Sequence, residues 1–490
     1  MLQSCTAQMS SLEDEIWKAA ERLRGNIDPS QYKNVILSLI FLRFVSDIEQ
    51  DDAQRIHVVI PPASEWTTIA QASNNPRMGA VVDKALRTMA RNNPLLASAL
   101  TPPFSLTEID SRRLGNLVEV LDTAWNFNGC GSRDVLGDIY EYCLDRFASI
   151  GGRSTGEFYT PSCVVELLVD LIEPFEGCVY DPCCGSGGMF VQSARFIEQH
   201  AGDLTNVSLY GQESNPVTWS IAYMNLALRG LVADLGPGHA DTLNKDIHPG
   251  KKFDFILANP PFNLKNWGSD VSASDARWIY GTPPDGNANF AWLQHMLSHL
   301  SSCGRMGVVL TNGSLSSKRN GEGDIRRAII EDDLIEGIVT LPGHLFSSTA
   351  ISVSLWILNK NKNQPGKTLF IDAQKRGKMI SCRQKVLTEL DIHEIHEVFN
   401  AFRRGDFIPQ QGFSTVATID EIAQCEYSLV PGRYIDVAYD ANNVCATDDF
   451  QESMFELHRE LKDLFHTSHA LEAEINDTIS SLGLAFDRDR

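Results

Sequence analysis

Cys178-Val-Tyr-Asp-Pro-Cys-Cys-Gly-Ser-Gly-Gly188 runs from a short apolar segment into a glycine-rich turn. This pattern predicts a strand over residues 178–180, a tight turn, and a helix that continues through Phe196. Glycine lets the backbone turn sharply and approach a ligand closely, because it has no Cβ atom. The spacing is not G-x-G-x-x-G, so the turn does not fit the dinucleotide-binding fingerprint well.

Short apolar strands alternate with amphipathic helices on both sides of this turn, from about residue 150 to 375. Such alternation predicts an α/β fold with a mostly parallel, doubly wound, Rossmann-like sheet. Binding sites in these sheets lie at the carboxyl ends of the strands, where the glycine turn and an Asn-Pro-Pro-Phe loop both fall. A helix is expected over 217–228, and further strands are expected over 207–211, 253–258, 308–310, 335–341, 352–358 and 368–371.

Three regions are expected along the chain. Residues 1–150 predict a helical N-terminal domain, in which Asp28-Pro-Ser-Gln31 offers an N-cap, a proline at the first helical position and a capping-box glutamine. Residues 151–400 hold the α/β domain, and residues 401–490 form a mixed C-terminal region.

A heptad-like apolar seam indicates a long helix over about 450–480, which would pack against another helix. Ser468 interrupts the seam, and the sequence leaves open whether the partner helix belongs to the same chain or to another. The seam consists of Phe450, Met454, Leu457, Leu461, Leu464, Leu471 and Ile475.

The composition of the 490 residues, with 43% hydrophobic and 21% charged residues, is that of a water-soluble globular protein. No apolar run is long enough to span a bilayer, and no signal segment opens the chain. The 11 cysteines show no C-x-x-C spacing. We therefore expect reduced thiols, a cytoplasmic location and no structural metal.

The formal net charge is −21, because the chain has 63 Asp and Glu residues and 42 Lys and Arg residues. A protein that binds DNA alone usually has a basic surplus, because phosphate neutralisation supplies most of the non-specific affinity. If DNA is a partner, either a local basic groove lies within an acidic whole or another polypeptide holds most of the DNA. An acidic surface that merely keeps the protein soluble is the third interpretation.

The glycine turn and two downstream carboxylates are candidate ligands for a nucleoside cofactor. An acidic residue at the end of a strand and a small-residue loop match the cradle for the amino-acid part of S-adenosyl-L-methionine, although a plain tight turn is the alternative. Glu213, at the end of the second strand, would accept hydrogen bonds from ribose hydroxyls unless it only caps a helix. Asp241, expected where the next strand ends, would accept from the adenine amino group. The turn residues are Asp181, Cys183, Gly185, Ser186, Gly187 and Gly188.

A second cofactor segment precedes the first strand. It comprises Glu157, Phe158, Tyr159, Thr160, Pro161 and Ser162. Phe158 and Tyr159 also fit as core aromatics. Thr160 and its backbone are expected to hold the methionine carboxylate and ammonium groups.

Asn259, Pro260, Pro261 and Phe262 are the candidate catalytic residues. A nucleobase amino group is a poor nucleophile, because its lone pair is delocalised into the ring. The Asn259 side-chain oxygen and the Pro260 carbonyl would accept its two hydrogens, localise the lone pair and favour attack on a sulfonium methyl. Two prolines keep these acceptors aimed. Phe262 offers a face on which a flipped base stacks.

Together these motifs resemble the modification (methylation) subunit of type I restriction-modification systems, over most of the chain. The resemblance tells least over about 50–130 and 376–425. The matching segments are 23–35, 39–43, 156–161, 181–189, 211–215, 218–219, 240–243, 258–263, 287–296, 341–346 and 431–434.

This resemblance implies that residues 151–400 form an S-adenosylmethionine-dependent methyltransferase domain that methylates adenine in DNA. It further implies two copies of the chain around one specificity subunit, which reads the sequence, and a separate restriction subunit that joins them. Delegated DNA recognition would fit the acidic charge. The helix over about 450–480 would then contact the specificity subunit.

Other functions remain open at this point. Enzymes that methylate a glutamine amide in proteins also use an N-P-P loop, since a planar amide poses the same chemical problem. A non-catalytic scaffold would be expected to have degenerate loops, whereas Asp181, Glu213, Asn259 and Phe262 are all chemically competent. A solitary modifier without a nuclease, and cytosine as the target base, are also compatible with these residues.

Overall fold

The computed structural model describes most of the chain and divides it into two compact units, Met1–Asp436 and Val437–Arg490. The described residues are 15–23, 29–46, 58–100, 106, 109–124, 139–144, 146–147, 160–200, 202–268, 275–346, 350–381, 384–435 and single positions between 458 and 472. Among them, no helix is both long and apolar enough to cross a membrane.

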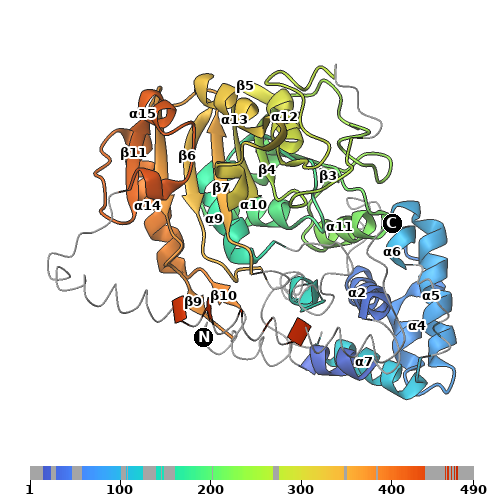
Figure 1. Cartoon of the computed structure of the whole chain (residues 1–490). Coiled ribbons are helices and arrows are strands. Elements are labelled where there is room, and N and C mark those ends of the chain that lie inside the picture. The colour runs from blue at the N-terminus through green and yellow to red at the C-terminus, as the bar shows by residue number, and fades with distance from the viewer. Residues whose placement is uncertain are drawn as a thin grey trace, which may run out of the picture. The chain divides into compact units, whose positions relative to one another are not determined.

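A nine-stranded sheet forms the centre of the first unit, with the order β11-β8-β6-β7-β5-β4-β1-β2-β3 (Figure 1). All of these strands run in one direction except β7 and β11, which are antiparallel to their neighbours. The strands are β1 (Gly177–Asp181), β2 (Val207–Gly211), β3 (Ala233–Asp234), β4 (Phe253–Ala258), β5 (Leu300–Thr311), β6 (Ile335–Thr340), β7 (Val353–Asn359), β8 (Lys367–Asp372) and β11 (Ser414–Thr418).

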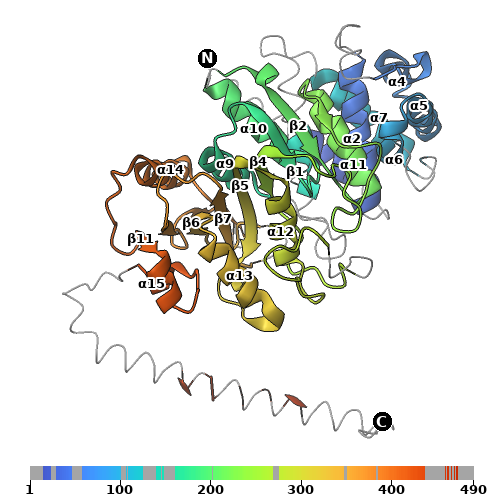
Figure 2. The ribbon, with the colours of Figure 1, turned by 90° about the horizontal axis from the view of Figure 1, so that it is seen from above.

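Helices cover both faces of this sheet, which confirms the doubly wound α/β fold (Figure 2). Every residue of β6 and β7 is buried, as expected for strands covered on both sides. One face carries α9 (Ser162–Ile172), α10 (Gly188–Gln199) and α14 (Glu389–Arg404), and the other carries α12 (Asn289–His299), α13 (Glu322–Glu331) and α15 (Ile419–Gln424).

Most of the predicted strands are confirmed within a residue of their ends, and the predicted helices appear as α10 and α11 (Pro216–Leu228). The expectation for β5 was too short, because its first half, Leu300-Ser-Ser-Cys-Gly304, is polar. The edge strands β3 and β11 were not predicted. A small hairpin of β9 (Lys378–Met379) and β10 (Lys385–Val386), which follows β8, was not predicted either.

The N-terminal region is helical, as predicted, and its first long helix begins at Pro29. Its helices share a core with α11 of the α/β region, which contributes Ile221, Met224 and Leu228. The Ser220 hydroxyl also donates to the Leu95 carbonyl over 2.9 Å. These helices are α2 (Pro29–Val45), α4 (Trp66–Gln71), α5 (Met78–Asn92), α6 (Ala97–Leu100) and α7 (Ser111–Ala124).

In the second unit, the described positions are helical and exposed. Leu461 and Leu471 of the predicted seam are about half exposed within this unit, as is Phe465. The other seam residues lie outside the described part of the chain.

Candidate active site

Three loops leave the carboxyl edge of the sheet side by side. They follow β2, β1 and β4, which are adjacent and parallel, so the residues after each strand lie at one edge. The loops contain Glu213, the glycine turn and Asn259, respectively. The sheet therefore brings these three predicted motifs together at one edge.

The glycine turn leads into α10 with a backbone that requires glycine at two positions. Gly185 has a φ of 56° and Gly187 a φ of 84°, both in the left-handed region. A Cβ added at Gly185 or Gly188 would have no neighbour within 4 Å in the part of the chain that the structure describes. Close packing of helix on strand therefore does not explain Gly188, and the space beside it is open for a ligand.

Glu213 links the second loop to the first. Its Oε2 accepts a hydrogen bond from the Gly185 amide at 3.1 Å, and its Oε1 accepts from the Asn215 amide at 2.7 Å. The cap of α11 is Asn215 itself, whose side chain accepts from the amides of Val217 and Thr218. Capping α11 is therefore not the role of Glu213.

Two neighbouring carboxyl groups lie at this edge, of which Asp181 is buried and Glu213 is partly buried. Burial raises the pKa of Asp181 to about 7, and the nearby Glu213 carboxylate adds to the rise. Burial likewise raises the pKa of Glu213, against the effect of the amides that donate to it. The Asp181 carboxylate accepts from the Cys183 amide at 3.0 Å. A ligand that brings positive charge or hydrogen-bond donors would offset this cost of burying carboxylates.

Asp241 does not lie at a strand end, which corrects the expectation from sequence. β3 ends at Asp234, and Asp241 is exposed in the long loop that leads to β4. Its carboxylate accepts from the Leu243 amide at 3.1 Å and from the Asn244 side chain at 2.8 Å.

Gln212 anchors this loop, and sequence reasoning gave it no role. It is fully buried, and its side-chain nitrogen donates to the carbonyls of Ala240 and Lys245. In addition, the Ala240 amide donates to the Glu213 carbonyl at 2.8 Å. Gln212 therefore fixes Asp241 beside the end of β2. Its place within Gly211-Gln-Glu-Ser-Asn215 was the available signal.

Of the two polar atoms of the Asn259 side-chain amide, only the nitrogen has a hydrogen-bond partner among the described residues. Its Nδ2 donates to the Thr160 hydroxyl at 2.8 Å. Its Oδ1 is buried and has no hydrogen-bond partner within the described chain. Buried acceptors are normally satisfied, so an unpaired one in a loop at the site indicates a missing donor.

A neighbouring loop and the first residue of α12 support the rest of the Asn259–Phe262 segment. The Phe262 ring meets Phe346 edge to face, with centroids 5.6 Å apart. Asn263 has a φ of 52°, and its amide donates to the Asn289 side chain, which donates back to the Asn263 side chain. Phe346 and Asn289 lie in segments that sequence analysis noted without assigning them a role.

The remaining predicted cofactor residues have mixed outcomes. Glu157, Phe158 and Tyr159 lie outside the described residues. Pro161 and Ser162 begin α9. The Ser186 carbonyl accepts from the Asn225 side chain of α11 at 2.8 Å.

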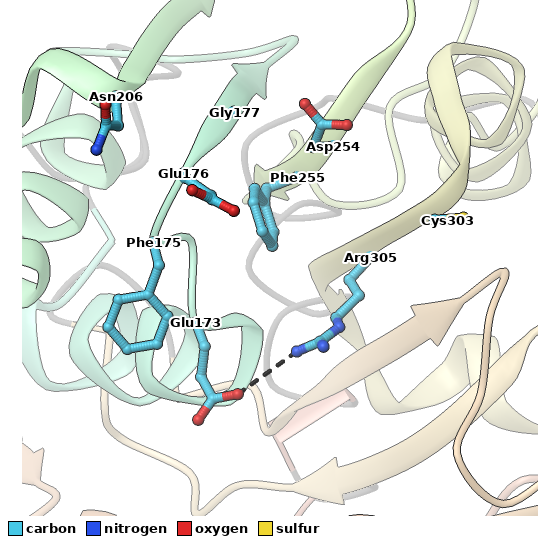
Figure 3. A pocket seen from close by; sticks show the side chains of 9 residues that line it. All are labelled: Glu173, Phe175, Glu176, Gly177, Asn206, Asp254, Phe255, Cys303 and Arg305. Atoms are coloured by element: carbon cyan, nitrogen blue, oxygen red, sulfur yellow. Dashed lines mark hydrogen bonds and ion pairs between the residues drawn. The ribbon is translucent and has the colours of Figure 1, made fainter.

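A separate hollow of about 630 Å³ opens at the opposite edge of the sheet (Figure 3). Its lining includes Gly177, Asp254 and Arg305, near the amino ends of β1, β4 and β5. Arg305 and Glu173 form an ion pair of 3.4 Å there. None of the predicted site residues that the structure describes lines this hollow, so it is distinct from the candidate active site.

This sheet, with its glycine turn, strand-end carboxylate and Asn-Pro-Pro-Phe loop, defines a methyltransferase of amino groups. The family model for N-6 DNA methylases matches residues 131–442, and that for the HsdM N-terminal domain matches residues 12–122. The chain therefore belongs to the N-6 DNA methylase family, among the methylase subunits of type I restriction enzymes.

Individual relatives agree with this assignment. The type I restriction enzyme HindI methylase subunit of Haemophilus influenzae is 43% identical over 411 residues, covering 82% of this chain and 92% of that protein. The MjaIX methylase subunit of Methanocaldococcus jannaschii is 33% identical over 516 residues, covering 96% and 91%. A solved type I restriction-modification methyltransferase subunit from Streptococcus thermophilus has a TM-score of 0.73 at 25% identity, covering 87% of this chain and 100% of that one.

Proposed function

We propose that this chain transfers the methyl group of S-adenosylmethionine to the N6 amino group of adenine in DNA, within a complex in which a specificity subunit selects the site. The observation that carries this proposal is the hydrogen bonding of the Asn259 side-chain amide. Its nitrogen donates to Thr160, while its buried oxygen has no partner among the described residues. An acceptor fixed in this way suits a ligand N–H, and an adenine amino group supplies one.

The chemistry follows from the Asn259–Phe262 loop. The Asn259 Oδ1 and the Pro260 carbonyl accept the two amino hydrogens and draw the nitrogen out of conjugation with the ring. Pro260 and Pro261 restrict the backbone, so the two acceptors keep their directions without reorganisation. With its lone pair localised by Asn259 and Pro260, this nitrogen would attack the methyl carbon of a bound S-adenosylmethionine, displace the thioether sulfur and then lose one proton. Phe262 packs against Phe346. In this proposal the flipped base stacks on the Phe262 ring.

The residues present fit the implied cofactor, which supplies an electrophilic methyl group on a sulfonium. The open space beside Gly185 and Gly188 would admit its amino-acid part. Asp181 is a buried acceptor and Glu213 a partly buried one, and a cationic or hydrogen-bond-donating ligand would offset the burial that raises both pKa values. Glu213 would bind the ribose hydroxyls, and Asp241 the adenine amino group of the cofactor.

The family to which the chain belongs indicates its protein partners. The relatives are named as methylase subunits of type I restriction enzymes. We propose that two copies of this chain join one specificity subunit in the cytoplasm, and that a restriction subunit can join them. We also retain the proposed division into residues 1–150, 151–400 and 401–490, with the helix over about 450–480 contacting the specificity subunit.

The test is methyl transfer from labelled S-adenosylmethionine to genomic DNA that lacks the host's methylation, with and without the encoded specificity subunit. Nucleoside analysis then locates the label. We expect methyladenosine only when the specificity subunit is present. Label without that subunit would make the chain a solitary modifier. Label in protein and none in DNA would favour the amide-methylating alternative.

A further inference from the structure

The hairpin formed by β9 and β10 is a basic segment within an acidic protein. The stretch 375–385 contains Lys375, Arg376, Lys378, Arg383 and Lys385 and no Asp or Glu. Across the whole chain, acidic residues outnumber basic ones by 63 to 42. This local reversal of charge matches one of the two arrangements by which a protein of net charge −21 could bind DNA, a basic patch within an acidic whole.

Two of these charges are not neutralised by the described chain. Arg376 pairs with Glu394 at 2.6 Å and lies over the Phe413 ring. The Lys385 ammonium donates to the Arg376 carbonyl at 3.3 Å. Lys375 and Lys378, in contrast, are exposed, and neither ammonium group has a hydrogen-bond or ion-pair partner among the described residues. Both remain available to an external anion.

The hairpin stands at the catalytic edge of the sheet. It follows β8, which runs in the same direction as β1 and β4, so it leaves the edge that also carries Asn259. Figure 1 shows it projecting from the body of the sheet.

Direct contacts connect the hairpin to the catalytic loop. The Lys385 amide donates to the His344 carbonyl at 2.8 Å. His344 belongs to the loop that follows β6, and Phe346 of that same loop packs against Phe262. Val386 and Phe262 also pack against one common apolar cluster. The hairpin is therefore part of the rim around the place where the target base enters.

We infer that the β9–β10 hairpin binds the phosphate backbone of duplex DNA beside the flipped adenine, through Lys375 and Lys378. A base can enter the site only if its duplex lies across this edge, which brings flanking phosphates to the rim. Lysine ammonium groups that bind phosphates release counterions, so each contact contributes to the salt dependence of binding. The inference rests on DNA being the substrate, as proposed above.

The test uses the complete complex with the specificity subunit and the double variant Lys375→Gln with Lys378→Gln. The dissociation constant for duplex DNA containing the recognised site is measured over a range of salt concentrations. We expect the slope of log affinity against log salt to become shallower by about 1.8, since each lost phosphate contact removes about 0.9. Affinity near physiological salt should fall on the order of tenfold.

The matched control is Lys367→Gln with Arg404→Gln, which removes the same charge near the opposite end of β8. Both residues are exposed there. The control should leave the salt slope unchanged, and both variants should bind S-adenosylmethionine like the wild type. Each single lysine variant should show about half of the double variant's change in slope.

Three results would overturn the assignment. The first is an unchanged slope in the Lys375, Lys378 variant, and the second is an equal change in the control. The third is loss of the specificity subunit from the variant on size-exclusion chromatography, which would make the hairpin a protein-binding element. Failure of the proposed function is distinguishable from all three, because the wild-type complex would then methylate no DNA.

Discussion

At the scale of single residues, the amide of Asn259 depends on the hydroxyl of Thr160, a residue that the sequence had associated with the cofactor. Thr160→Val removes the acceptor for Nδ2 but keeps the shape of the side chain. A buried amide nitrogen without a partner costs about 1–3 kcal/mol, so the amide is expected to rotate away from its catalytic direction. The rate of methylation in a single turnover should therefore fall on the order of tenfold or more.

Thr160→Ser is the control for this prediction, because it retains the hydroxyl and should keep most of the rate. Calorimetry should give the same dissociation constant for S-adenosylmethionine in both variants and in the wild type. Weaker cofactor binding in Thr160→Val, with an unaltered rate at saturation, would instead assign Thr160 to the cofactor.

Asp181 gives a prediction about pH. Its pKa is about 7 in the folded protein, against an ordinary value of 3.8, because it is buried. Between these values the folded protein retains a proton that the unfolded chain has released, so stability falls as pH rises through this window. Asp181→Asn should remove that loss and stabilise the cofactor-free protein at pH 8, by on the order of 2–4 kcal/mol. It should have little effect at pH 4.

Thermal melting of both proteins at the two pH values would measure this difference. The same substitution should weaken binding of S-adenosylmethionine, since the site carboxylate is lost. An equal effect on the melting temperature at pH 4 and pH 8 would contradict the ionisation argument.

At the scale of elements, the glycine turn contains glycines that its backbone conformation requires and one, Gly188, that it does not require. Gly188 can therefore be used to test whether the space beside the turn admits a ligand. Gly188→Ala adds a methyl group into open space at the first residue of α10, where the backbone is not left-handed. Thermal stability should therefore stay close to that of the wild type. Affinity for S-adenosylmethionine should fall by at least tenfold, because the methyl group occupies the space left for the cofactor.

Gly432→Ala is the matched control, since an added Cβ there also meets no described neighbour within 4 Å, in a short helix after α15. It should change neither stability nor cofactor affinity. If Gly188→Ala bound the cofactor normally in a calorimetric titration, the open space beside the turn would not be the cofactor site.

The sequence predicted those strands whose apolar runs end in turn residues, such as β2 and β4. It did not predict β3, which has only two residues, or β11, whose residues Ser414-Thr-Val-Ala-Thr418 are mostly polar or small. An edge strand is defined by hydrogen bonds to its neighbour, and its own composition carries little of that information.

The candidate site shows the same limit. Asn259 and Glu213 could be identified because their motifs have a chemical meaning. The contacts of Asn259 with Thr160, of Phe262 with Phe346 and of Gln212 with the loop around Asp241 join segments far apart in sequence. Such contacts arise only once the sheet has brought the strand ends together.

At the scale of the whole molecule, the described site residues all lie in the unit Met1–Asp436. Deleting residues 450–490 should therefore leave cofactor binding unchanged, as measured by calorimetry. Co-purification with the specificity subunit should be lost, because the half-exposed Leu461 and Leu471 would no longer be available to a partner helix. An intact complex after the deletion would show that the specificity subunit binds elsewhere.

Helix α11 contacts two different parts of the protein, and these contacts limit which segments can be exchanged with those of a relative. Its Ile221, Met224 and Leu228 complete the core of the N-terminal helices, while its Asn225 holds the Ser186 carbonyl of the glycine turn. One helix thus contacts both the core of the N-terminal helices and the glycine turn. A chimera that takes its N-terminal helices from a relative should fold and bind the cofactor only if α11 comes from the same relative, so the exchanged segment must extend beyond β2.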